Sequence, residues 1–429
     1  MTEGSTNAER VDDMDQRQKA LTKAIEEDKE ELFDILSKLI QINSENFRTY
    51  GNETACPEFV KECFDRFGCE AEVYSPLDIP DFEQHPDYWP GRNLHGRKNC
   101  TAILPGAHHN RKLMLAAHHD TVEIGDEKNW TVPPLGGVIR DGKLFGRGAC
   151  DDKYGIAVAI FLMKKLKELG ITLDYDLLFT AYCDEEHGGS NGALAMCLKY
   201  PCDDYLNMDG MEYEISDTGV GGGGLIFRLQ SRQTTDNCSQ VFAGLQVLVQ
   251  ELEAFGGRRR QELAEDGNFA NTVVADGAMR LLMVNTDPVN LGSGMAKVTY
   301  YTNKPQESIR QELAQLKDSV DSRLEPLGLM PLEIEQATRF FHYVEGIENN
   351  PMVELLQTCG KENGMPLGRM GICLSDLPMF HLYGSPRSVI FGLGRDFGSY
   401  GGAHQPDEYV ECDKLVAFTK TMAAVLLNY

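Results

Sequence analysis

The sequence predicts an α/β fold in which helices flank a mostly parallel sheet and a small α+β domain is inserted. Two observations carry this prediction. Strand-like apolar runs alternate with helix-like periodicity from Cys100 to Gly210, the βαβα order of a parallel sheet. A β-α-β-β-α-β series of ferredoxin-like order then runs from Leu225 to Ala337, and the α/β pattern resumes after it.

The same patterns divide the 429 residues into parts. We expect residues 1–216 and 339–429 to form one main domain and residues 217–338 to form the inserted one. A chain of this length has room for two or three domains. Four successive glycines, residues 221–224, mark the entry into the insertion. Glycine's conformational freedom suits either a hinge or a close approach of two backbones.

Helical periodicity opens the first part, with Leu32, Leu36 and Leu39 on one face. A later helix is apolar nearly all round between Ile156 and Met163, which predicts that it is buried. The expected helices of the first part cover residues 15–42, 56–67, 152–169 and 191–200, and the expected strands cover residues 70–74, 100–104, 113–117, 175–183 and 204–208. A long loop rich in proline, aspartate and aromatic residues covers residues 77–93.

The remaining elements follow from the same rules. Alternating apolar residues predict the strands and the 3.6-residue period predicts the helices. The expected strands cover residues 225–231, 277–284, 296–302, 332–337 and 388–392, and the expected helices cover residues 237–254, 305–324, 351–363 and 413–427.

Charge and composition exclude several classes of partner. The net charge of −25 argues against nucleic acid or an anionic membrane as the main partner. The twelve cysteines include no C-x-x-C pair, which indicates thiols in a reducing compartment. Residues 1–41 are polar, and no stretch of about 18 apolar residues occurs. We therefore expect a cytoplasmic protein without a secretory signal or membrane span.

Two histidines and three carboxylates fall at predicted strand ends, at a helix start or in a glycine-rich loop. They are His118, Asp151, Glu186, Asp209 and His404. Ligands of open α/β sheets bind at the carboxyl ends of the strands, and these side-chain types suit a pair of zinc ions. Each residue alone is a weak signal, because a chain with 66 acidic residues contains such groups by chance.

Glu185 and Glu186 are informative as neighbours. At a strand end, successive side chains point in opposite directions. One glutamate can therefore hold metal while the other faces the attacking water, as a general base must.

These residues resemble the motifs of the cocatalytic-zinc peptidase and amidohydrolase superfamily, metallopeptidase family M-twenty. That family contains dipeptidases, aminoacylase, acetylornithine deacetylase, succinyl-diaminopimelate desuccinylase and glutamate carboxypeptidase. The matching segments are His118-x-Asp120, Asp151-Asp152-Lys153, Asp184-Glu185-Glu186, Asp209 and Ala403-His404-x-Pro406. They occur in the family's order and span nearly the whole chain.

The resemblance implies two divalent ions, zinc first, with cobalt or manganese as alternatives. The implied ligands form two sets that share one member: His118, Asp151 and Asp209 for one ion, and Asp151, Glu186 and His404 for the other. Glu185 is implied as the general base, and Asp120 as the residue that orients His118 through its second ring nitrogen. The family typically has a cis peptide after the shared aspartate.

The sequence departs from the family pattern in two places. The inserted domain usually contributes a histidine to the oxyanion, but none lies between His187 and His342. The candidates to replace it, among which the sequence does not choose, are Arg280, Asn285 and Asn290. Tyr154 stands where a glycine is usual, and its ring could narrow the pocket.

Three further residues are candidates for binding substrate. Ser375 and Asp376 resemble a serine or threonine–aspartate segment of the family near the substrate, although a helix cap explains them equally well. Arg369 could pair with a substrate carboxylate, against the alternative of an ordinary surface arginine.

The resemblance implies zinc-dependent hydrolysis of an amide bond in a small peptide or N-acyl amino acid. In the family, an aspartate at position 209 accompanies dipeptidase or aminopeptidase activity, so we expect a dipeptidase. The first alternative is an N-acyl amino-acid deacylase of the acetylornithine or succinyl-diaminopimelate type, and the second is a non-catalytic metal-binding homologue. We expect the inserted domain to act as a lid over the site and to provide the interface of a homodimer.

Overall fold

The computed structural model describes residues 7–372 and 374–429. The chain divides into two compact units. The first comprises the chain up to Asp217 together with Gly346–Arg369 and Met379–Tyr429, and the second comprises Thr218–Glu345 and Met370–Pro378. The second unit extends past the expected residue 338, because the chain after its last strand continues to pair with residues 219–222 through isolated bridges to Phe341 and Val344.

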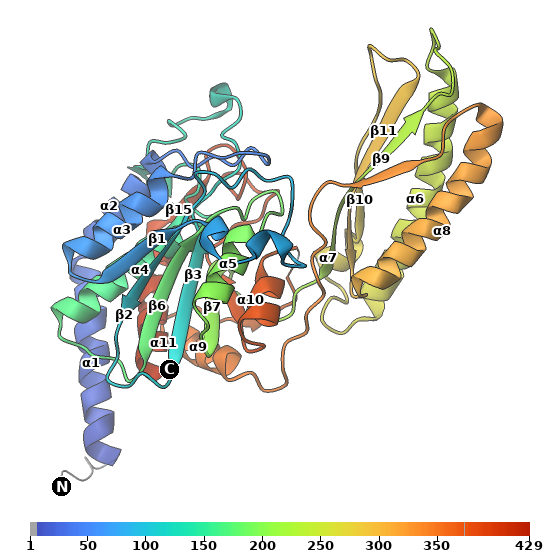
Figure 1. Ribbon diagram of the computed structural model, residues 1–429. Coiled ribbons are helices and arrows are strands. Elements are labelled where there is room, and N and C mark those ends of the chain that lie inside the picture. The colour runs from blue at the N-terminus through green and yellow to red at the C-terminus, as the bar shows by residue number, and fades with distance from the viewer. Residues whose placement is uncertain (1–6, 373) are drawn as a thin grey trace. The chain divides into compact units, whose positions relative to one another are not determined.

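The first unit is built on an eight-stranded sheet with the order β1-β2-β6-β3-β7-β14-β8-β13 (Figure 1). Its strands are β1 (Glu70–Tyr74), β2 (Asn99–Leu104), β3 (Lys112–His118), β6 (Asp176–Tyr182), β7 (Asp204–Glu212), β8 (Glu214–Ser216), β13 (Gly368–Arg369) and β14 (Val389–Gly392). The central strands β6, β3, β7 and β14 are parallel; β2 pairs antiparallel with β6, and β1 pairs antiparallel with β2. The predicted α/β class is confirmed.

Helices cover both faces of this sheet (Figure 1). They are α1 (Asn7–Glu27), α2 (Lys29–Gln41), α3 (Ala55–Arg66), α4 (Lys153–Glu168), α5 (Asn191–Lys199), α9 (Pro351–Glu362), α10 (Leu377–Tyr383) and α11 (Cys412–Asn428). Alternate residues of β3 face the two sides: Leu113 and Leu115 enter the larger core under α4 and α11, and Met114 enters the smaller one under α5. None of the described helices is long and apolar enough to cross a bilayer.

The single helix expected over residues 15–42 is wrong. Two helices stand there, because Asp28 leaves helical geometry with φ −107° and ψ 18°. The Asp28 carboxylate instead accepts a hydrogen bond from Lys165 Nζ at 2.6 Å, which ties the break to α4.

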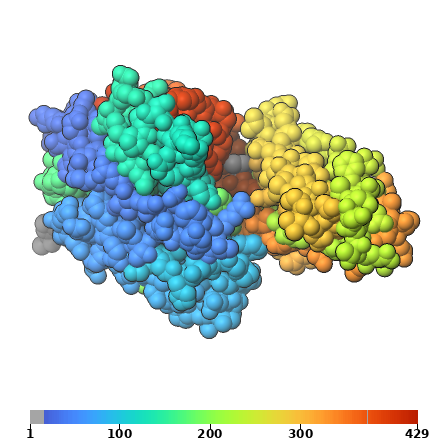
Figure 2. Space-filling view, turned by 90° about the horizontal axis from the view of Figure 1, so that it is seen from above, coloured from blue at the N-terminus to red at the C-terminus, as the bar shows by residue number. Residues whose placement is uncertain are grey.

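A small three-stranded sheet, not predicted from the sequence, joins distant parts of the first unit. It pairs β15 (Tyr409–Glu411) with β5 (Lys143–Phe145), and β5 with β4 (Val138–Arg140). On the face of this unit seen in Figure 2, a teal segment from the first half of the chain lies beside a red segment from near its end. The pairing of Tyr409 with Phe145 brings the loop that carries His404 to the turn that carries Asp151.

The second unit has the expected β-α-β-β-α-β order. Its elements are β9 (Gly221–Gln230), α6 (Ser239–Glu265), α7 (Val273–Asp276), β10 (Met279–Thr286), β11 (Ser293–Thr302), α8 (Gln306–Leu324) and β12 (Glu333–Gln336). The sheet order is β10-β11-β9-β12, and all neighbours are antiparallel. Helices α6 and α8 contribute Leu248, Phe255 and Leu316 to a core shared with Phe227 and Val298. Among the described residues, 3-10 turns also form at Pro76–Asp78, Phe82–Gln84 and Glu127–Asn129 in the first unit and at Glu325–Leu327 in the second.

The glycine run is part of a strand and not a hinge. Residues 221–224 lie in β9 and pair with residues 299–302 of β11. At Gly222, φ is +131° and an added Cβ would stand 2.1 Å from the carbonyl oxygen of Tyr300. At Gly223, an added Cβ would stand 2.7 Å from the carbonyl oxygen of Arg339. Close backbone approach, the other alternative for this run, explains the glycines.

Replacing Gly222 with alanine should therefore lower the free energy of unfolding by about 2–4 kcal/mol, because the new Cβ meets a carbonyl oxygen and the residue keeps a positive φ. Equilibrium denaturation in urea measures the change. Gly257→Ala is the matched control: it lies in α6 with open space around it, and it should gain up to about 1 kcal/mol of helix propensity. Equal midpoints for the two variants would contradict the prediction.

Candidate metal centre

The five predicted ligands come from separate elements of the first unit. His118 ends β3, Asp151 lies in the turn before α4, and Glu186 follows β6. Asp209 lies within β7, which continues to Glu212 instead of ending at the expected residue 208, and His404 precedes β15. Strands β3, β6 and β7 run parallel, so their carboxyl ends meet at one edge of the sheet.

The structure brings these side chains together in two groups that share Asp151. One group is His118, Asp151 and Asp209, and the other is Asp151, Glu186 and His404; within each group the ligand atoms lie within 4.8 Å of one another. The two carboxylate oxygens of Asp151 face different histidines. Oδ1 is 2.9 Å from His118 Nε2, and Oδ2 is 3.2 Å from His404 Nε2.

The outer members complete each group at similar spacing. Asp209 Oδ1 is 3.9 Å from His118 Nε2, and Glu186 Oε2 is 3.1 Å from His404 Nε2. Two ligands that each lie about 2.0–2.2 Å from a zinc ion in tetrahedral geometry are about 3–4 Å apart. The spacing and the nitrogen and oxygen donors therefore fit a pair of divalent cations.

The electrostatics of the cluster reflect its burial and its opposite charges. Burial alone would lower the pKa of His404, but the carboxylates of Glu186 and Asp151 raise it to about 11. Burial alone would raise the pKa of the Asp151 carboxyl, but hydrogen bonds from His118 and His404 hold it well below its usual range. A carboxylate kept ionised between two imidazoles is prepared to bind cations.

Asp120 is buried beside the cluster, and its contacts differ from the expected one. His118 Nδ1 lies 2.8 Å from the main-chain oxygen of Asp120, while the nearer carboxylate oxygen is 3.7 Å away. The carboxylate instead accepts the N–H of Glu185 at 3.1 Å and the N–H of Glu186 at 3.0 Å. Asp120 thus orients the histidine with its backbone and holds the two glutamates with its side chain.

Glu185 lies next to the centre and belongs to neither ligand group among the described residues. Its carboxylate contributes to raising the pKa of His118, together with the stronger interactions of Asp151 and Asp209 that offset burial. The Glu185 carboxylate therefore lies near enough to His118 to interact with it electrostatically.

Glu408 is a buried residue of the site for which the sequence predicted no role. Its Oε1 accepts the N–H of Cys150 at 3.0 Å, and its Oε2 accepts Arg147 Nη1 at 2.7 Å. These bonds hold the turn before Asp151 against the segment after His404. The peptide bond between Asp151 and Asp152 is cis, as the resemblance implied.

A comparison with protein-family models now bears on this geometry. The model described as "Peptidase family M20/M25/M40" matches residues 114–428, which is most of the chain. The chain belongs to this peptidase family. Family membership confirms the resemblance found in the sequence motifs.

One relative of this family member is an N-formyl-4-amino-5-aminomethyl-2-methylpyrimidine deformylase of Halalkalibacterium halodurans. The two chains are 26% identical over 205 residues, a match that covers 47% of this chain and 43% of the relative. The matched region thus spans less than half of the relative's length.

Two solved structures share the fold of this M20 family member. A di-peptidase of Saccharomyces cerevisiae aligns with a TM-score of 0.71 and 15% identity, covering 96% of this chain and 98% of that one. A Bacillus subtilis protein described as a dinuclear metal binding peptidase of the family aligns with a TM-score of 0.59 and 11% identity, covering 95% and 98%. At these identities the likeness shows the fold.

The predicted substrate residues of this family member have partners inside the protein. Arg369 pairs with the Asp217 carboxylate through Nε at 2.9 Å and Nη2 at 3.0 Å. Ser375 Oγ accepts the N–H of Leu377, the first residue of α10, at 3.4 Å, and Asp376 is buried. Substrate binding by Arg369, Ser375 and Asp376 stays a prediction.

The three candidates to replace a histidine, which is absent from the expected range 217–338, lie in the second unit, in or after β10; that unit as observed extends to Glu345 and includes His342. Arg280 stands over the Tyr301 ring at 5.6 Å, and Asn290 Oδ1 accepts the N–H of Gly292 at 3.3 Å. Asn285 is exposed near the end of the strand. These contacts do not favour one candidate over another.

Tyr154, whose ring could narrow the pocket, lies in the interior of the first unit. Its side chain is fully buried against Phe418. Its hydroxyl donates to the carbonyl of Met208 and accepts the N–H of Leu393 at 2.7 Å. It therefore joins β7 to the chain just after β14, in the interior of the sheet.

Tyr154→Phe should accordingly lower the free energy of unfolding by about 1–3 kcal/mol, because it leaves a buried N–H and a buried carbonyl without this partner. Urea denaturation tests this, with Tyr50→Phe as the control because Tyr50 is 54% exposed. Indistinguishable unfolding curves for the two variants would show that the hydroxyl contributes nothing.

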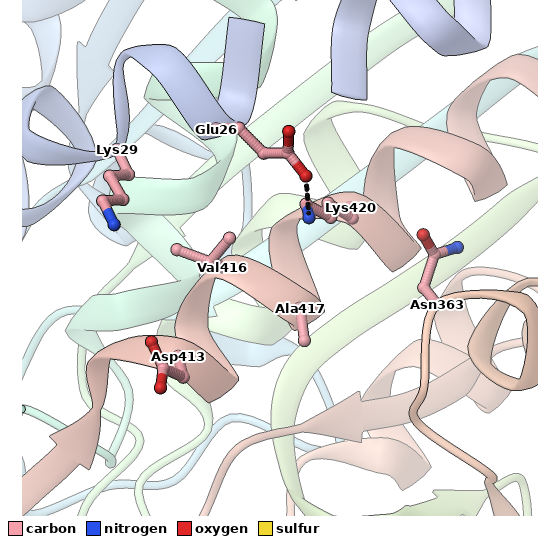
Figure 3. A pocket seen from close by; sticks show the side chains of 7 residues that line it. All are labelled: Glu26, Lys29, Asn363, Asp413, Val416, Ala417 and Lys420. Carbon is pink, nitrogen blue, oxygen red and sulfur yellow. Dashed lines mark hydrogen bonds and ion pairs between the residues drawn. The ribbon is translucent and has the colours of Figure 1, made fainter. Parts of the chain in front are cut away.

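A groove elsewhere on the first unit is a separate feature (Figure 3). It is lined by side chains of α1, α2, α11 and the end of α9: Glu26, Lys29, Asn363, Asp413, Val416, Ala417 and Lys420. Glu26 and Lys420 form an ion pair at 2.7 Å on its wall. The groove contains none of the predicted ligands, so it is not the candidate active site.

Proposed function

We propose that the protein hydrolyses an amide bond in a small amino-acid conjugate, most simply a dipeptide, with two divalent cations held by the residues above. The observation that carries this proposal is the position of Asp151 between two histidines, with one carboxylate oxygen toward each. Two neighbouring cations can be held together by one carboxylate that serves as a ligand of both. Zinc is the first candidate because the ligands are imidazoles and carboxylates.

The protein's own residues then divide the work. When bound, the cations would lower the pKa of a shared water toward neutrality and polarise the substrate carbonyl. Glu185 accepts the proton of the attacking water at its carboxylate and later delivers it to the leaving nitrogen. Asp120 keeps Glu185 within reach, because its carboxylate binds the Glu185 N–H.

Two substrate classes fit this chemistry. Asp209, in place of glutamate, favours a dipeptidase or aminopeptidase by analogy with the family. The match to a deformylase favours the second candidate, a deacylase of N-acyl amino acids or related amides. Both reactions break a C–N bond at a carbonyl, so the metal centre alone does not separate them.

A substrate panel separates these candidates. Purified protein loaded with Zn²⁺, Co²⁺ or Mn²⁺ is assayed against unblocked dipeptides and against N-formyl, N-acetyl and N-succinyl amino acids. The proposal expects turnover that a chelator abolishes and added metal restores, with dipeptides preferred by about tenfold or more in kcat/KM. Absence of turnover on every amide with all three metals would favour the non-catalytic alternative.

We also propose a homodimer formed through the second unit. Strand β10 is the edge of its sheet, and the apolar side chains Leu281, Leu282, Met283 and Val284 are 40–52% exposed on it. An exposed apolar edge strand is a template for pairing with another chain. Sedimentation velocity tests this, and a monomer at micromolar concentration would contradict it.

A further inference from the structure

The long segment between β1 and β2, residues 75–98, supplies none of the proposed ligands. Only two short 3-10 turns interrupt its irregular course. Loops of more than about 12–15 residues without regular structure are uncommon in compact domains unless they serve a function. Two arginines near its end, Arg92 and Arg97, are 8% and 0% exposed. Both contact the segment that carries Glu185.

That segment, Asp184–His187, is not held by a sheet ladder. It begins and ends in left-handed geometry, with φ of +59° at both Asp184 and His187. The N–H groups of Glu185 and Glu186 bind the Asp120 carboxylate. Side chains from elsewhere in the unit therefore fix the direction in which the base and its neighbouring ligand point.

Arg92 binds the opposite side of the same segment. Its Nη2 donates to the carbonyl oxygen of His187 at 2.8 Å and to that of Glu186 at 3.2 Å. Its Nη1 donates to the carbonyl oxygen of Arg48 at 2.5 Å, which fixes the guanidinium itself. One planar group thus holds two successive carbonyls, and so the orientation of the two peptide planes that flank the Cα atom of His187.

The start of the segment is anchored by the same loop. Arg97 forms ion pairs with Asp184 and, at 3.0 Å, with Glu53, and all three side chains are fully buried. The Asp184 carboxylate also accepts Asn191 Nδ2 at 2.8 Å, and Asn191 Oδ1 accepts the N–H of Trp89 at 3.0 Å. The loop of residues 75–98 therefore binds the segment Asp184–His187 at both its start and its end.

We propose that Arg92 is a positioning residue for the general base Glu185 and the metal ligand Glu186, and that the loop of residues 75–98 exists to deliver it. This proposal rests on the proposed function for its catalytic consequence. Without Arg92, two carbonyls lose a charged donor and the segment gains freedom about the Glu185 and Glu186 backbone. Lysine keeps the charge but not the planar fork that reaches two acceptors at once.

The test compares Arg92→Gln and Arg92→Lys with Arg387→Gln. Arg387 is a matched control because its Nη2 donates to the carbonyl of Asp203 and it pairs with Asp204, at the opposite end of β7. We expect kcat of both Arg92 variants to fall about 10–100-fold and Zn²⁺ affinity to weaken by a similar factor. KM should change less than about threefold, because the substrate contacts are untouched.

A readout independent of activity is hydrogen exchange of the metal-free protein. Exchange should quicken in peptides covering residues 184–190 in both Arg92 variants and stay unchanged in Arg387→Gln. Unchanged exchange there, or unchanged kcat in an active enzyme, would overturn the proposal. Unfolding of both variants would also overturn it, since Arg92 would then serve the fold. If wild-type protein hydrolyses nothing, the proposed function fails, and local exchange still decides whether Arg92 holds the segment.

Discussion

Replacing Glu185 with glutamine should reduce kcat by about 10²–10⁴-fold, the usual contribution of a positioned general base. Glutamine has the size of glutamate but accepts no proton at neutral pH. Because Glu185 belongs to neither ligand group, the variant should bind as much metal as the wild type. The segment should also keep its place, since the Glu185 N–H still binds the Asp120 carboxylate.

Steady-state kinetics and metal analysis by atomic emission measure the two halves of this result. Glu62→Gln is the control, because Glu62 is exposed on α3 and pairs with Arg66 four residues later. A Glu185→Gln enzyme with unchanged kcat would remove Glu185 as the base. A variant that lost metal would instead identify Glu185 as a ligand.

Replacing Asp151 with asparagine should strongly reduce both metal loading and activity. The substitution removes the negative charge that faces His118 and His404 and leaves one oxygen where two were shared. A shared carboxylate that contributes several kcal/mol of charge stabilisation corresponds to a loss of about 10³-fold or more at about 1.4 kcal/mol per tenfold. Zn²⁺ titration by calorimetry should show the wild-type stoichiometry reduced.

Asp141→Asn is the matched control for this experiment. Asp141 lies in the turn between β4 and β5 with φ of +51°, a geometry that asparagine accepts, and its side chain is exposed. The control should retain metal and activity. Two ions bound at wild-type affinity in Asp151→Asn would refute a shared carboxylate at this position.

The ends of the strands could be predicted from the sequence, because a buried strand is a run of apolar residues. The apolar run before His118 and the one before Glu186 stop at the sheet edge, where buried polar residues follow, so polar residues mark the carboxyl ends. The parallel order of these strands then implies that the ligands converge. The same reasoning placed Asp209 just after its strand, whereas β7 continues to Glu212 through pairing that no local periodicity reveals.

Contacts between distant residues could not be predicted. Strands β4, β5 and β15 have three residues each, too short for a period to show. Glu408 binds Cys150 across 258 positions, and Asn46 binds Asp120 across 74. Such pairs depend on tertiary structure, since neither partner carries a local signal. The glycine run was ambiguous for the same reason, because its crowding comes from Tyr300 and Arg339.

The place of β14 in the large sheet has a consequence for biosynthesis. This strand lies between β7 and β8, although roughly 180 residues separate it from β7 along the chain. At roughly 5–20 residues per second, a ribosome needs about 10–35 s to make that stretch. During this interval the nascent polypeptide exposes the edge of β7. Such an exposed edge promotes aggregation, and a holding chaperone should shield it. Shortening the delay with a circular permutant should raise the soluble yield.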